Sequence, residues 1–173
     1  MPHLRFGAAL FVCASIYAQQ TPSLQGVIHH RLESATVLAL SAVAADAKNT
    51  DAGTRHFNVA AIEPEAVSFT EFEDGRYVAV MSIDASSLRA ARIHFQSLQL
   101  PEGAELYLYS ERGRGEAPPF AVGPYTNVGP LDGSDFWSDA LPGGQSIIVE
   151  LQVRGEIPSA LPFQIDLVEE LES

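Results

Sequence analysis

The strongest constraint on the fold is a two-residue alternation of apolar and polar side chains that recurs along the chain. It is clearest in residues 91–96, where Ala91, Ile93 and Phe95 are each followed by a polar residue. Residues 146–153 and 163–168 repeat the same spacing. Successive side chains of a strand point to opposite faces, so this period indicates sheets with one buried and one solvated face. The alternation therefore predicts a mainly β protein.

In individual strands the spacing predicts which side chains share a face. Leu106 and Leu108 fall on one side of residues 105–110, and Tyr107 and Tyr109 on the other. In the last strand the period places Leu167 on the same side as Phe163 and Ile165. By the same period Val168 lies on the opposite, solvated side.

Proline and glycine divide the strands from one another. Residues 55–61 end before Pro64, the turn 73–75 precedes a strand over 76–83, and the turn 101–103 precedes a strand over 105–110. Residues 136–138 are short enough for an edge strand, and Pro142-Gly143 turns the chain into the strand at 146–153. About seven or eight short strands with regular turns are typical of an antiparallel β-sandwich or jelly roll. We assign this domain to residues 55–173.

One helix is predicted before the strands. Residues 31–48 are rich in alanine, contain Leu32, Leu40 and Val43, and lack glycine and proline. Asn49 and Gly53 are suitable for ending a helix. Residues 19–54 are therefore expected to form a polar leader followed by a helix.

Residues 1–18 have the pattern of an export signal. Arg5 is followed by an apolar run from Phe6 to Ala14, and Ile16-Tyr17-Ala18 offers a cleavage site. The run is shorter than the about 20 apolar residues that span a bilayer. Cys13, the single cysteine, follows Val12 rather than the small residue that lipoprotein processing requires. The expected product is a secreted or periplasmic bacterial protein without disulfides, held to no membrane once the signal is removed.

The chain is acidic, with a formal net charge of −12. Such a charge repels the phosphates of nucleic acids and anionic lipid surfaces, which excludes both as expected partners. It favours either simple solubility outside the cell or attraction to a basic partner.

No catalytic pattern stands out. The nearest approach to a serine-hydrolase turn is Asp132-Gly133-Ser134-Asp135, whose order is wrong for a nucleophile elbow. The histidines form no metal-binding pair, and alternation places His94 on the solvated side of its strand. We therefore expect neither enzymatic activity nor a cofactor.

Two weaker patterns suggest ligands. Asp132, Asp135 and Asp139 lie close together in a glycine-containing loop, where their oxygens suit calcium or, alternatively, ordinary Asx turns.

Tyr125, Phe136 and Trp137 are candidates for an aromatic platform that binds a glycan. The alternative is that these rings simply pack in the protein, because aromatic side chains supply much of the buried area of a small domain.

Several segments occur in an order known from one family of secreted enzymes. Residues 95–109 fit the pattern F-x-x-x-x-L-P-x-G-A-x-L-Y-x-Y, which is followed by Gly-Pro-Tyr-Thr at 123–126 and Phe-Trp at 136–137. The matching segments are Arg55–Val59, Ala91–Ser110, Val122–Thr126, Asp135–Ser138 and Leu141–Leu151. Over residues 32–167 the chain resembles the non-catalytic N-terminal region of bacterial trypsin-like serine proteases of the lysyl-endopeptidase type.

The resemblance implies a pro-region or accessory module that binds a secreted trypsin-like peptidase. No protease domain with its triad follows the matching region before Ser173, so the resemblance carries no protease activity with it. The module is expected either to stand alone or to be the front part of a longer, interrupted protease. Gly144 replaces an acid common in the family, so no role is carried over to that turn. From the residues alone, the alternative is a carbohydrate- or cell-surface-binding module.

Overall fold

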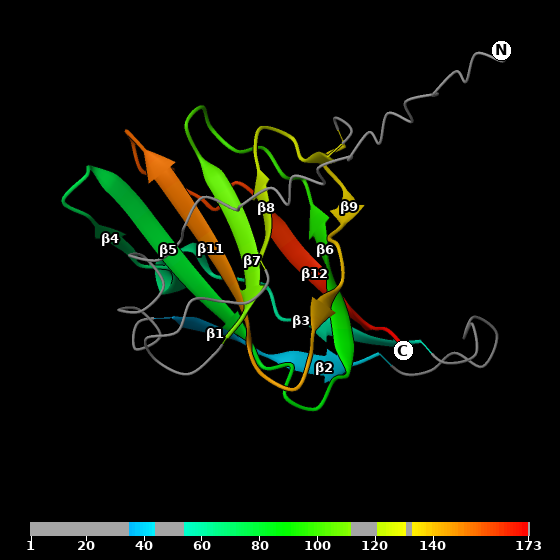
Figure 1. The fold of residues 1–173 in the computed structure, drawn as a ribbon. Helices are drawn as coiled ribbons and strands as arrows, with labels where there is room; N and C mark the ends of the chain where they lie inside the picture. Colours follow the sequence, from blue (N-terminus) through cyan, green and yellow to red (C-terminus); the bar gives the residue numbers. More distant parts are fainter. Residues whose placement is uncertain (1–34, 44–53, 112–120, 131–132, 173) are drawn as a thin grey trace, which may run out of the picture.

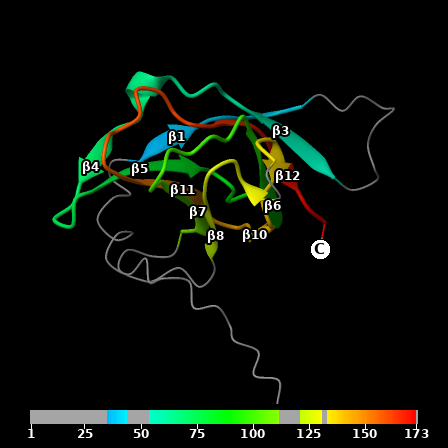
Figure 2. The same ribbon diagram turned by 90° about the horizontal axis from the view of Figure 1, so that it is seen from above.

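The fold consists of two six-stranded sheets that face each other (Figures 1 and 2). The computed structural model describes residues 35–43, 54–111, 121–130 and 133–172. Sheet A contains β1 (Thr36–Leu38), β4 (Phe69–Glu71), β5 (Arg76–Ile83), β7 (Glu105–Ser110), β8 (Ala121–Tyr125) and β11 (Ile147–Arg154). Sheet B contains β2 (Leu40–Ala42), β3 (Arg55–Val59), β6 (Ala90–Gln96), β9 (Phe136–Trp137), β10 (Leu141–Pro142) and β12 (Gln164–Glu170).

The strand order is β1-β5-β11-β7-β8 in sheet A and β10-β6-β12-β3-β2 in sheet B. In addition, β4 pairs with β5, and β9 pairs with β6. Only the β1–β5 pair is parallel among the described strands. A 3₁₀ turn lies at Pro64–Ala66, and the described residues contain no α-helix. The prediction of a mainly β protein is confirmed.

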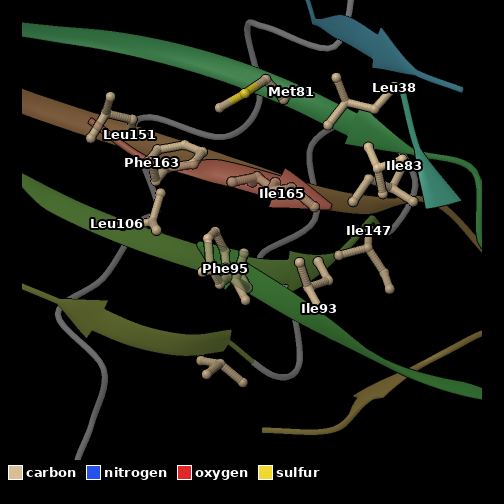
Figure 3. Close-up of a cluster of buried hydrophobic side chains, with 14 of the residues drawn as sticks. Leu38, Met81, Ile83, Ile93, Phe95, Leu106, Ile147, Leu151, Phe163 and Ile165 are labelled. Atoms are coloured by element: carbon tan, nitrogen blue, oxygen red, sulfur yellow. The ribbon is translucent and has the colours of Figure 1, made fainter. Parts of the chain in front are cut away.

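The facing sides of the sheets share one apolar cluster (Figure 3). Ile93, Phe95 and Ile165 enter it from sheet B, and Leu106 and Ile147 from sheet A. All five side chains are buried. Burial of an aliphatic or aromatic side chain of this size contributes about 1.5–3 kcal/mol, so this cluster is the main source of stability.

The expected helix over residues 31–48 is wrong for the part that the structure describes. Residues 36–38 pair with β5 and residues 40–42 pair with β3, so this short stretch adds a strand to each sheet. Leu38 is 5% exposed while its neighbour Val37 is 74% exposed, which is the alternation of a strand. Edge strands of both sheets offer backbone partners here, and this tertiary pairing overrides the helix propensity of the alanines.

The predicted facing of the last strand is also wrong at its centre. A register shift between Ile165 and Leu167 places Val168, fully buried, on the core side with Ile165. A β-bulge adds one residue to the strand, which reverses the alternation after it. The predictions for β7 hold: Leu106 belongs to the main cluster, and Tyr107 to a second cluster.

The turn after β10 requires glycine at one position. A Cβ on Gly143 would lie 2.1 Å from the carbonyl oxygen of Leu88. The backbone of the expected Pro142-Gly143 turn therefore lies against the backbone at Leu88. Any residue with a Cβ at position 143 would clash there.

Two expectations concern residues outside the described part. The signal at 1–18 lies there, as does most of the leader at 19–54. Of the residues that are described, none forms a helix long and apolar enough to cross a membrane.

Candidate binding surface

The outer face of sheet B carries a continuous group of charged and aromatic side chains. Strand register aligns them: Arg92 lies opposite Glu169, which lies opposite His56, and His94 lies opposite Trp137. Because alternate residues of a strand share a face, these side chains all point away from the core. We call the group the Trp137 face; its members are His56 of β3, Arg92 and His94 of β6, Trp137 of β9, and Asp166 and Glu169 of β12.

Glu169 is the charged centre of this face. Its Oε1 lies 3.3 Å from Nε2 of His56, and its Oε2 accepts a hydrogen bond from Nε of Arg92. The Glu169 side chain is only 8% exposed. A carboxylate is rarely buried to this degree without partners, and Arg92 and His56 provide them from the strands on either side.

Trp137 packs against three of these polar side chains. The guanidinium carbon of Arg92 lies 4.8 Å from the centre of the indole ring, which is a cation–π contact. The His94 ring centre is 4.8 Å away, and the His56 ring lies edge-on at 6.2 Å. The indole is therefore held in one orientation before any ligand arrives.

The bulge in β12 completes the group by positioning Asp166. Oδ1 of Asp166 lies 2.7 Å from Nδ1 of His94. This contact fixes the orientation of the imidazole, so that Nδ1 carries the hydrogen that Asp166 accepts. Without the extra residue of the bulge, the alternation of β12 would not place Asp166 and Glu169 on the same side.

Backbone contacts on both sides of β9 hold Trp137 in place. Before the strand, the Asp135 carboxylate accepts a hydrogen bond of 2.7 Å from the Ser97 amide. After it, the Ser138 amide donates to the Ile93 carbonyl at 2.8 Å, and Oγ of Ser138 accepts from the Ile93 amide at 3.0 Å. A strand of two residues is otherwise weakly held, so these bonds determine its register against β6.

The three predicted platform residues do not share one surface. The rings of Tyr125 and Phe136 lie tilted to each other with centres 5.0 Å apart, and Phe136 stacks on the buried ring of Phe95 at 5.3 Å. Burial raises the pKa of Tyr125 to about 12. Tyr125 and Phe136 thus pack on the core side, while the next residue, Trp137, points outward.

The calcium candidates separate in a similar way. Asp135 accepts a hydrogen bond from the Ser97 amide, a contact between distant residues rather than an Asx turn, and the Asp139 carbonyl accepts from Ser138 Oγ at 2.9 Å. Asp132 lies outside the described residues. Within the described ranges, no group of three or more histidine, cysteine or acidic side chains could hold a metal ion.

Sequence reasoning found Trp137 but missed its partners. Alternation correctly placed Arg92 and His94 on the outer side of β6, but His94 was expected to be merely solvated. Cross-strand register brings His56 and Glu169 to the same place from sequence positions more than a hundred residues apart. Among these residues, the sequence predicted the outward position of Arg92 and His94 only, and its period placed Glu169 on the buried side.

No family model matches the chain, and no curated protein matches it.

Proposed function

We propose that the chain is an exported, non-catalytic accessory domain with a β-sandwich arrangement of its two sheets, and that it binds a protein partner through the Trp137 face. The resemblance to the pro-region of secreted trypsin-like proteases supports a partner of that peptidase class. The observation that carries the proposal is the combination of Trp137, Arg92 and two histidines on one open face of sheet B.

Tryptophan and arginine are the residue types that most often dominate the binding energy of protein interfaces. On this face their side chains are already ordered by Glu169 and His94. Ordering before binding lowers the entropy that association must overcome. Arg92 is 37% exposed, so part of its guanidinium is available to a partner.

The proposal is tested by capture of secreted proteins with the exported chain and with two variants. The wild type is expected to retain a trypsin-like peptidase. Trp137→Ala should weaken its retention by at least about tenfold, the size expected for a hot-spot residue.

Val37→Ala, which alters an exposed side chain on β1, is the matched control and should retain the peptidase fully. Equal capture by the wild type and Trp137→Ala would contradict the role of this face. Capture that contains no peptidase would contradict the proposed partner.

The second candidate function is carbohydrate or cell-surface binding. Trp137 supports it, because an indole beside the hydrogen-bonding groups of Arg92 and His94 is a suitable surface for a sugar ring. Tyr125 and Phe136 face the core, so this function would depend on Trp137 alone. A glycan array separates the two functions: glycan binding that Trp137→Ala abolishes favours the second, and glycan binding that survives the change removes it.

A further inference from the structure

The outer face of sheet A, which points away from sheet B, is buried. On the outer face of sheet B, by contrast, the outward residues of β6 stay half-buried. Antiparallel sheets commonly leave one face in water, so burial of both faces of sheet A requires chain packed over the outer one. The buried residues of this face are 0–6% exposed; they are Val78, Val80, Tyr107, Tyr109, Ile148, Glu150 and Gln152.

The described residues at the margins of this face show where the chain reaches it. Phe72 and Ala35 pack against the second cluster beside β5, and Ala121 packs against it from the start of β8 at the other edge. The buried centre of the face, Ile148 and Glu150, lies on β11 between these edges. Ala35 directly precedes β1, so the chain that leads into β1 arrives beside the second cluster.

The residues before Ala35 have the length and the composition to pack over this face. Residues 19–34, which lie outside the described part, reach roughly 50 Å when extended. The distance from β5 across β11 to β7 is only roughly 10 Å. Four apolar side chains are distributed along the segment; they are Leu24, Val27, Ile28 and Leu32.

The charge at the centre of the face also fits this segment. In the strand register Glu150 lies between Val80 and Tyr107, so its carboxylate is surrounded by apolar groups and aromatic rings. It accepts hydrogen bonds from Tyr109 and Gln152. A buried carboxylate in such surroundings favours an occupant that brings a positive charge together with apolar side chains. Residues 28–32 supply this combination, because they place Arg31 between two apolar residues.

We propose that the outer face of sheet A is a docking surface for the chain's own N-terminal segment, residues 19–34, which packs over the second cluster and completes it as a core. The surface lies on the opposite side of the molecule from the Trp137 face, so this inference does not depend on the peptidase partner. Because the contact is noncovalent, the same face should also bind the segment when it is supplied as a separate peptide.

Docking is tested by the reactivity of a thiol placed beneath the segment. In the full chain with Cys13→Ala, which removes the single cysteine, Val80→Cys places one thiol in the second cluster and Val37→Cys places one at an exposed reference site. The first thiol should react with a water-soluble reagent at least about a hundredfold more slowly than the second, because it must wait for local opening. Val27→Asp with Ile28→Asp should raise the slow rate at least about tenfold, because carboxylates are costly to bury among apolar groups.

A matched control keeps the added charge and changes only its position. Gln20→Asp with Gln25→Asp alters polar positions of the same segment and should leave the rate of the Val80→Cys thiol within about twofold. The fluorescence of Trp137, the single tryptophan, should stay unchanged in every variant and so show that sheet B remains folded. Should the two aspartates at 27 and 28 unfold the chain, alanines at these positions provide the same comparison.

A peptide of residues 19–34 is the probe for binding in trans. Added to the folded variant with aspartates at 27 and 28, it should slow the reaction of the Val80→Cys thiol again, and a peptide carrying the same two aspartates should not. No slowing by the first peptide would overturn the proposal. A rate that the substitutions at 27 and 28 leave unchanged would also overturn it, in favour of residues 112–120 as the occupant. Protection that is lost on dilution of the chain would overturn it in favour of a second copy.

Discussion

The two sheets differ most on their outer faces. In β6 of sheet B, buried and half-buried residues alternate along the whole strand. In β11 of sheet A, every residue from Ile147 to Val153 is buried. A second apolar cluster accounts for this difference; its members are Val78, Val80, Tyr107, Tyr109 and Ile148, with Ala35, Phe72 and Ala121 packed against it.

The polar groups of the two outer faces also differ in how deeply they are buried. On sheet A, Glu150 is fully buried and accepts hydrogen bonds from Tyr109 at 2.9 Å and from Gln152 at 2.7 Å. Burial, together with the hydrogen bond to Glu105, raises the pKa of Tyr107 on that side. On sheet B the ion pairs of the Trp137 face remain partly accessible. Sheet A therefore buries its outer face under a second cluster, while sheet B leaves its charged outer face partly exposed.

The largest expected effect is on the second cluster. Ile148→Ala should lower the free energy of unfolding by about 2–5 kcal/mol, because it removes buried methylene groups and leaves a cavity. Denaturant unfolding measures the change. Val37→Ala, at an exposed position of the same sheet, should stay within about 0.5 kcal/mol of the wild type. If Ile148→Ala and Val37→Ala lowered the free energy of unfolding equally, the second cluster on the outer face of sheet A would not be a hydrophobic core.

A smaller effect is expected from the polar part of the same face. Glu150→Leu keeps the approximate size of the side chain but removes the acceptor that Tyr109 and Gln152 share. Loss of such a buried partner should cost about 1–3 kcal/mol in unfolding free energy. Adding Tyr109→Phe should recover part of this cost, because the hydroxyl then needs no acceptor. A double variant less stable than Glu150→Leu would contradict this account of the network.

The sequence was sufficient for the parts of the fold that depend on local pattern. The alternation of β6 predicted the buried sides of Ile93 and Phe95, and turn residues located the ends of β5 and β7. It did not predict that Ile148 and Glu150, on the side expected to be solvated, are buried. Burial of a second face depends on what packs against the sheet, which no periodicity within the strand can show.

The same limit applies to the candidate site. Trp137 was recognisable as a residue type suited to binding, but its three polar contacts arise from the register between β3, β12, β6 and β9. The bulge at Asp166 shifts that register by one residue and leaves no distinctive residue pattern. Within the helix expected over residues 31–48, the described part is wrong for a related reason, because pairing with a strand distant in sequence decided the conformation of Thr36–Leu38.

The smallest expected effect concerns the ion pair at the centre of the Trp137 face. A double-mutant cycle with Arg92→Ala and Glu169→Gln should give a coupling energy of about 0.2–1 kcal/mol, because the pair is partly exposed to water. The coupling should decrease further as salt is added. Denaturant unfolding of the four proteins at two salt concentrations measures it. A coupling energy that does not change with salt and is as large as the cost of Glu150→Leu would contradict this expectation. The Arg92–Glu169 pair would then stabilise the fold as the hydrogen bonds of Glu150 do in sheet A. A small, salt-sensitive value instead means that the pair contributes little to the stability of the fold, as expected for an arginine that is partly exposed to water.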